Sequence, residues 1–252
     1  MLRVTVIASG NVYQMAAASA ASTFALFAHN PSSVSVLVPV GERISRSLRR
    51  QSLQFGFSIE RFPFDGDLGE ENFTGRLKCT AFAWKLEQLK AGEIALFADA
   101  DTACLRKVRL PKAIKRQILL SQVGMVPDIK DRHCLDSAAA YYLASKNRCV
   151  YVNSGVIFAS RKSLGFFETV RQLANNPEVL AGPFQDQNAI NFAFGRYFPK
   201  TLLPLDKKFN AIQEFNKQTV IAHFAGGAGL LGQHVRKSKH LKTCSRVIMN
   251  VT

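Results

Sequence analysis

The sequence lacks the features of several special classes of protein. No apolar run reaches the length of about 18 residues that a membrane-spanning helix needs. The run after Met1 is short, from Val4 to Ala8, and this predicts a first strand rather than a signal peptide. The 5 cysteines are odd in number and show no CxxC spacing, so we expect free thiols in a reducing compartment.

Acidic residues are also scarce. The chain has 18 of them against 33 lysines and arginines, which gives a formal net charge of +15. Such an excess implies an anionic partner: nucleic acid, a membrane surface or a phosphorylated substrate, with a solvated basic surface as the plain alternative. Basic residues cluster between Arg106 and Arg116, but no helix-turn-helix, zinc-finger or RNA-binding aromatic signature accompanies them, so no nucleic acid is expected.

The hydrophobic pattern predicts an α/β fold. In the first half, strands alternate with helices. Strands are expected at 4–8, 33–39, 58–62 and 94–98, and helices at 14–28, 41–54 and 72–89. The second half is mixed, with strands expected at 118–126, 150–159 and 219–224 and helices at 164–175 and 186–194. Repeated βα units indicate a mixed, mainly parallel sheet with helices on both faces. In the helix at 41–54, Ile44, Leu48 and Leu53 are the expected inward residues.

Two carboxylates follow the predicted buried strand at 94–98. Side chains alternate along an extended chain, so Asp99 and Asp101 are expected to share one face. Ligands of open α/β sheets bind outside the carboxyl ends of the strands, which is where this pair lies. Two close carboxylates repel each other unless a cation lies between them. The pair therefore predicts a site for Mg²⁺ or Mn²⁺ that bridges to a substrate phosphate, against the alternative of two surface aspartates in a loop.

Three further motifs carry polar residues. Asn153-Ser154-Gly155 interrupts a strand, which is typical of a bulge or of close approach by a ligand. Asp186 and Gln187 open a helix, where Asp186 is either an N-cap or part of a polar pocket. His223 follows a short strand, and an imidazole beside two carboxylates favours Mn²⁺ over Mg²⁺ or Ca²⁺.

In this order, the strand with Asp-x-Asp, Asn-Ser-Gly, Asp-Gln and the late His-x-x-Gly resemble the retaining glycosyltransferases of the GT-A fold. The chain is most similar to glycosyltransferase family 8, the glycogenin and bacterial lipopolysaccharide galactosyltransferase group. The resemblance runs from the first strand to Gly226. It implies a single Rossmann-like domain over 1–252, with a nucleotide-sugar-binding half at 1–105, an acceptor-side half at 106–231 and a basic tail at 232–252.

The resemblance also implies roles for particular residues. Asp99, Asp101 and His223 are the implied ligands of Mn²⁺ (or Mg²⁺), which grips the donor diphosphate. Asp186 and Gln187 are the implied catalytic residues beside the anomeric carbon. The implied donor or acceptor contacts are Asn11, Tyr13, Lys78, Ala100, Asn153, Ser154, Gly155 and Gly226. For Lys78, Arg76 and Lys85 are alternative matches.

The resemblance further implies the reaction and its partners. A hexose moves from a nucleotide-sugar, with UDP-glucose or UDP-galactose favoured, to a glycan or lipid-linked acceptor with retention of configuration. The basic tail predicts peripheral contact with an anionic membrane, so the expected location is the cytoplasm or the inner membrane surface.

Two positions depart from the family pattern. Ser9-Gly10 stands where the family often has an acidic residue after the first strand, and Gly229 stands where a lysine binds the diphosphate. Lys207, Lys208 or Lys237 could then meet the phosphate charge. The competing function is nucleotidyl transfer, but the segment after the first strand lacks the basic, glycine-rich loop that this reaction requires.

Overall fold

The structure is a computed structural model, and it describes residues 1–66, 73–128, 150–179, 185–212 and 215–224. The described residues form two compact units. One contains Met1 and the described parts of 64–95 and 111–205, and the other contains 2–63, 96–110 and the described part of 206–224. Each unit is described by itself below.

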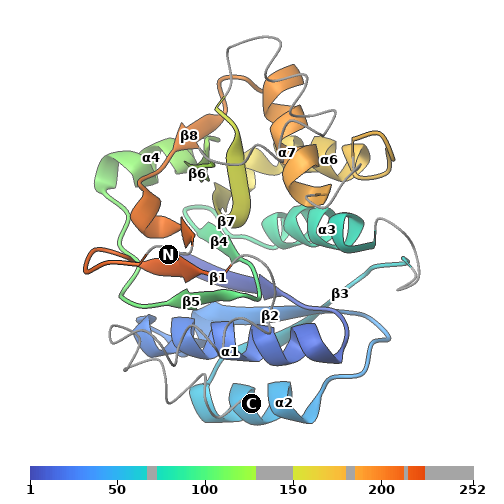
Figure 1. Ribbon diagram of the computed structural model, residues 1–252, viewed down its shortest axis with the longest axis vertical. Helices are drawn as coiled ribbons and strands as arrows, with labels where there is room; N and C mark the ends of the chain where they lie inside the picture. Colours follow the sequence, from blue (N-terminus) through green and yellow to red (C-terminus); the bar gives the residue numbers. More distant parts are fainter. Residues whose placement is uncertain (67–72, 129–149, 180–184, 213–214, 225–252) are drawn as a thin grey trace. The chain divides into compact units, whose positions relative to one another are not determined.

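The unit that begins at Leu2 is built on three parallel strands. These are β1 (Leu2–Ile7), β2 (Val34–Pro39) and β3 (Ser58–Phe62), with β2 pairing to both others. Helix α1 (Asn11–Phe27) packs on β1 and β2, and α2 (Arg46–Phe55) packs on α1 (Figure 1). The buried face of α1 is mostly alanine and serine, which lets it approach the strands closely. Gly10 makes the turn into α1 with a φ of 74°, a conformation that favours glycine.

Helix α2 begins later than the sequence predicted. Its N-cap is Ser45, whose hydroxyl accepts a hydrogen bond from the Leu48 backbone N–H at 3.2 Å. The residues before it form a loop in which Glu42 bonds to Ser9, Gly10 and Gln14. Leu53 is 87% exposed, so its predicted inward position is wrong. It lies five residues after buried Leu48, about 140° around the helix.

A second, small sheet belongs to the same unit. Its strands are β5 (Thr102–Cys104), β9 (Ala211–Ile212) and β10 (Ile221–His223), with β10 antiparallel to β5 and parallel to β9. Ala103 and Ala222 of this sheet form a buried cluster with Phe224. The sequence predicted only the last strand, because two or three residues are too few to show a period.

The other unit is built on β6 (Val123–Pro127), β7 (Val152–Ser160) and β8 (Leu202–Pro204). Strand β6 is antiparallel to β7 and parallel to β8. Figure 1 shows α4 (Lys112–Leu119) on one side of β6 and β7 and α3 (Phe73–Glu87), α6 (Leu164–Leu173) and α7 (Gln185–Arg196) on the other. Aromatic rings join these three helices: Phe82 of α3 meets Phe167 of α6 edge-on with centroids 5.7 Å apart, and Phe166 of α6 stacks on Phe194 of α7 at 4.4 Å.

One predicted strand is wrong at its start. The sequence predicted a strand over 118–126, but Ile118 is the buried residue of α4 and the strand begins at Val123. A short apolar run does not distinguish a buried helical turn from a strand. Ser121, with a φ of 104°, separates the helix from the strand.

The predicted fold class is confirmed. A mixed sheet of 7 strands, which includes the buried strand β4 (Ile94–Ala98), has the order β3-β2-β1-β4-β7-β6-β8 and is flanked by helices. Strands β3 and β4 have the predicted bounds. None of the helices in the described parts of the chain combines the length and the hydrophobicity that crossing a membrane requires.

Candidate metal centre and polar cluster

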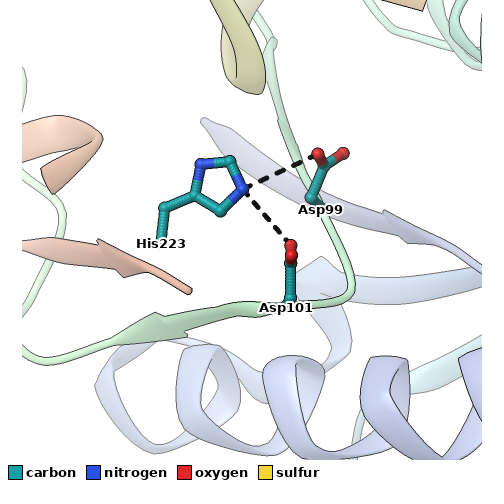
Figure 2. Close-up of side chains that lie close together, drawn as sticks. All are labelled: Asp99, Asp101 and His223. Carbon is teal, nitrogen blue, oxygen red and sulfur yellow. Dashed lines mark ion pairs between the residues drawn. The ribbon is translucent and has the colours of Figure 1, made fainter. Parts of the chain in front are cut away.

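Two strand ends bring Asp99, Asp101 and His223 together (Figure 2). Strand β4 is buried throughout and ends at Ala98, so the two aspartates emerge from the core in the turn before β5. His223 is the last residue of β10 and pairs with Thr102 in the small sheet. The backbone N–H of Phe224 donates to the Asp101 carbonyl oxygen at 3.0 Å, which fixes this end of β10 beside the turn.

The three side chains converge on one point. His223 Nε2 lies 3.3 Å from Asp101 Oδ1 and 3.9 Å from Asp99 Oδ2. One ligand atom from each residue lies within 4.8 Å of the others. The sequence predicted a shared face from an extended chain, which is wrong in detail. Asp99 instead begins a turn, with its carbonyl oxygen accepting from the Thr102 N–H at 3.1 Å and hydroxyl at 2.7 Å.

A fourth residue orients the imidazole. His223 is buried, and its Nδ1 lies 3.0 Å from Asn210 Oδ1. A carbonyl oxygen can only accept, so Nδ1 carries the proton in this bond and the Nε2 of a neutral ring presents its lone pair to the carboxylates. Metal-bound histidines are oriented by such outer hydrogen bonds. Asn210 was not predicted from the sequence, because an isolated asparagine 13 residues before His223 carries no local signal.

This arrangement fits a divalent cation. A lone pair and two carboxylate oxygens face one another, and three electron-rich groups at these distances need a proton or a cation among them. Carboxylates suit Mg²⁺ and Mn²⁺, and the added imidazole favours a transition metal such as Mn²⁺. The two aspartates are partly exposed, so the site has an open side for a ligand.

His223→Ala is expected to lower the affinity for Mn²⁺ by more than tenfold, and Asn210→Ala by about tenfold, because the second change frees the ring without removing it. Titration calorimetry with Mn²⁺ measures both. The matched control is His29→Ala, which removes an exposed imidazole. An unchanged affinity in His223→Ala would exclude this residue from the ligand set. In the wild type, acid should weaken binding, because protons compete for a ligand imidazole.

A second polar cluster forms in the other unit, where β6 and β7 meet α7. Gln187 is 4% exposed and lies at its centre. Its Oε1 accepts from the Ser154 backbone N–H at 3.1 Å, and its Nε2 donates to the Tyr151 hydroxyl at 3.2 Å and to Asp128 Oδ2 at 3.4 Å. Asn153 Nδ2 donates to the same carboxylate oxygen at 3.4 Å. The predicted residues of β7 and α7 therefore lie together.

The partners fix which way the Gln187 carboxamide points. A backbone N–H only donates and a carboxylate only accepts, so oxygen must face Ser154 and nitrogen must face Asp128. The Tyr151 hydroxyl accepts from this nitrogen and donates to Asn188 Oδ1 at 3.2 Å. The sequence analysis missed Asp128 and Tyr151. Both flank apolar strands, and nothing in the sequence shows that they face α7.

Asn191 anchors α7 to β7. Its side chain accepts from the Val152 N–H at 2.8 Å and donates to the Val152 carbonyl oxygen at 2.9 Å. The same amide nitrogen donates to the Gln187 carbonyl oxygen at 2.8 Å. The Asn191 side chain thus gives the Val152 backbone the hydrogen-bond partners that a neighbouring strand would otherwise supply. It also joins the first turn of α7 to β7.

Asn191→Ala is expected to lower the free energy of unfolding by about 1–3 kcal/mol for each buried backbone group left without its partner. Denaturant unfolding followed by circular dichroism measures the loss. Asn175→Ala, at an exposed position, should change stability by less than about 0.5 kcal/mol. If the two variants were equally stable, the anchoring role of Asn191 would be wrong.

Asp186 and Lys78 form a partly buried ion pair between α7 and α3. The Lys78 Nζ lies 2.7 Å from Asp186 Oδ2. The helices approach closely because a Cβ at Gly75 would lie 2.7 Å from Gln185 Cβ. Asp186 lies in the first turn of α7, which begins at Gln185, so it is not the N-cap. Burial raises the pKa of the Cys79 thiol, and the charge of Asp186 raises it further, so Cys79 is not a thiolate at neutral pH.

The remaining predicted contacts lie in α1, in the turn after β4 and within β7. Asn11 and Tyr13 are exposed in the first turn of α1, and Ala100 lies between the two aspartates. The Gly155 N–H donates to Asn153 Oδ1 at 2.9 Å. Their contacts with donor or acceptor stay predictions.

A carboxylate does lie beside Ser9-Gly10, and it comes from another segment. Glu42 accepts hydrogen bonds from the Ser9 hydroxyl at 2.8 Å, from the Gly10 N–H and from Gln14 Nε2 at 2.8 Å. Glu42 therefore brings a carboxylate to the N-terminus of α1, where Ser9-Gly10 carries none of its own.

Several predicted features lie outside the described residues. They are Gly226, Gly229, Lys237, the basic tail at 232–252 and three of the cysteines, Cys134, Cys149 and Cys244.

The fold is that of the GT-A glycosyltransferases, as the sequence resemblance implied. No protein-family model matches the chain, and no curated protein matches it in sequence. The likeness is to solved structures at low identity, and it establishes the fold.

Three such structures illustrate the likeness. Mouse xyloside xylosyltransferase 1 is 13% identical, with a TM-score of 0.59 over 89% of this chain and 98% of that one. The galactosyltransferase LgtC, in complex with donor and acceptor sugar analogs, is 14% identical, with a TM-score of 0.59 over 97% and 100% of the two chains. The bifunctional glycosyltransferase WbbM is 13% identical, with a TM-score of 0.60 over 98% of this chain and 52% of its own.

Proposed function

We propose that this chain is a metal-dependent glycosyltransferase. It transfers a hexose from a nucleotide-sugar, with UDP-glucose or UDP-galactose favoured, to a glycan or lipid-linked acceptor with retention of configuration. Asp99, Asp101 and His223 hold Mn²⁺ or Mg²⁺ in this proposal, and Asp186 and Gln187 act beside the reacting sugar.

The observation that carries the proposal is the Asp99–Asp101–His223 group. It follows the buried strand β4 of a GT-A fold, and its ligand atoms lie within 4.8 Å of one another. A glycosyl donor carries a diphosphate, which needs a counter-charge when it leaves. A divalent cation held there supplies a Lewis acid for the charge that develops on this diphosphate.

The residues of the chain prepare the reaction by position and charge. Asp99 and Asp101 supply the negative charge that binds the cation, and Asn210 keeps His223 aligned with them. Buried hydrogen bonds hold the Gln187 carboxamide in one orientation, as a positioned group needs. A neutral carboxamide is a poor nucleophile and a carboxylate a better one, so a covalent route would use Asp186. The other route is attack by the acceptor from the face that the diphosphate leaves.

A ligand-dependent melting experiment tests the proposed function. UDP with Mn²⁺ should raise the melting temperature, whereas either one alone should raise it less, because each binds the folded protein more tightly when the other is present. A panel of nucleotide-sugars, assayed for Mn²⁺-dependent hydrolysis and transfer, then identifies the donor. Duplex DNA should give no stabilisation. Release of pyrophosphate from UTP and a sugar 1-phosphate, with no transfer from any nucleotide-sugar, would show a nucleotidyltransferase instead.

A further inference from the structure

Three separate segments meet at the N-terminal end of β6. They are α4 with the residues that follow it, the end of β7, and the segment before β8. The Ser160 hydroxyl donates to the Ile118 carbonyl oxygen at 2.8 Å, and Gln122 Nε2 donates to the Lys200 carbonyl oxygen at 3.4 Å. These bonds make the three segments one continuous edge of their unit.

This edge is exposed and carries positive charge only. Its cations, which we call the basic rim, are Lys112, Lys115, Arg116, Arg161, Lys162 and Lys200, and all six are exposed. No acidic residue occurs in 102–127, 150–167 or 187–205, the stretches that supply the rim. Within the described residues, none of the six lies in an ion pair. In the part of the chain that the structure describes, no ion pair therefore neutralises the charge of the rim.

The α4 cations share one helical face. Lys112, Lys115 and Arg116 are spaced i, i+3 and i+4, so they are neighbours on the helix surface, and all three are exposed, whereas Ile118 is buried. Apolar groups accompany these charges at the surface. Leu120, just past the end of α4, is 58% exposed, and Tyr197, three residues before Lys200, is 54% exposed.

The basic rim is distant from the polar cluster of the same unit. Asp128 directly follows the last residue of β6, whereas the rim lies next to the first residue of this strand. A strand of 5 residues spans about 16 Å. The rim therefore lies apart from Gln187 and Asp128, and any partner that it binds is separate from a ligand of that cluster.

We propose that the basic rim is a docking surface for an anionic lipid bilayer. Lysine and arginine are attracted to anionic headgroups, and an exposed leucine and tyrosine fit the interface between headgroups and acyl chains. A nucleic acid satisfies the charges but gives the exposed leucine no apolar environment. The proposal is independent of the proposed catalytic function, because it uses none of the residues assigned to metal or substrate.

The test compares binding of the full chain to vesicles of phosphatidylcholine with and without one quarter phosphatidylglycerol. The wild type should co-sediment with the anionic vesicles only, and less so as salt rises. The variant Lys112→Gln, Lys115→Gln and Arg116→Gln should bind about a hundredfold more weakly, since each cation near an anionic surface contributes roughly a factor of five to the affinity. Leu120→Ser should weaken the binding that persists at high salt.

The matched control is Arg43→Gln, Arg46→Gln and Arg49→Gln, which removes three exposed cations in and before α2. Both triple variants lose the same charge and keep the basic tail. If the basic rim is the docking surface, only the α4 variant should lose binding. Equal losses in both would show that net charge alone drives binding and would overturn the proposal. Undiminished binding of the α4 variant to anionic vesicles would also overturn it. So would binding of duplex DNA that depends on the α4 cations, if the wild type does not bind vesicles. Melting temperatures confirm that each variant is folded.

Discussion

Asp101→Asn should abolish glycosyl transfer while leaving the protein folded. The substitution keeps the shape of the side chain and removes a charged oxygen that lies 3.3 Å from His223 Nε2. Loss of several kcal/mol of charge stabilisation at the leaving diphosphate corresponds to a fall in turnover of about three orders of magnitude. Binding of UDP should lose its dependence on Mn²⁺ as well. Turnover of the best donor and calorimetry with UDP, each with and without Mn²⁺, measure the two effects.

The fold should survive because the substitution keeps the backbone bond that Asp101 makes at the end of β10. The Asp101 carbonyl oxygen accepts from the Phe224 N–H, and this bond does not involve the side chain that changes. The matched control is Asp65→Asn, which removes an exposed carboxylate and should leave turnover unchanged. Turnover near the wild-type level in Asp101→Asn would show that the metal assignment is wrong. Loss of turnover with Mn²⁺-dependent UDP binding intact would assign Asp101 to the sugar instead.

The sequence predicted the fold best where an apolar run was short and clearly bounded. The strand at 94–98 has five apolar residues between Glu93 and Asp99, and its bounds are those of β4. The prediction at 118–126 was wrong at its start, because the apolar residues of a helical turn run directly into those of the strand. The loop before α2 was missed for another reason: Glu42 bonds to Ser9 and Gln14, residues about 30 positions away, and propensity does not register such contacts.

The candidate sites follow the same physical logic. Asp99, Asp101 and His223 could be predicted, because each lies next to an apolar strand and their residue types suit one cation. Asn210 and Asp128 could not. Their roles depend on single hydrogen bonds to His223 and Gln187, 13 and 59 residues further along the chain. Such residues are visible only when the tertiary structure brings their partners within reach.

Gln187→Ala should lower turnover about a hundredfold and change the affinity for UDP by less than about twofold. The carboxamide joins the Ser154 backbone, Tyr151 and Asp128, so its loss releases groups from β6 and β7 at the same time. A displacement of about 1 Å in positioned groups can cost a hundredfold in rate. No bond of Gln187 involves the metal-binding residues, so nucleotide binding through the cation should be retained. Steady-state kinetics and UDP calorimetry separate the two effects.

Two further variants separate catalysis from simple loss of structure. Gln88→Ala removes an exposed carboxamide and should change neither quantity. Tyr151→Phe removes one hydroxyl, leaves the Ser154 and Asp128 bonds of Gln187 in place and should lower turnover by a smaller factor, about tenfold for a single hydrogen bond. This gradation at constant UDP affinity identifies the cluster as a positioning device for the reacting sugar. Equal losses of turnover and UDP affinity in Gln187→Ala would assign the cluster to the nucleotide, and wild-type turnover in both variants would remove Gln187 from the active site.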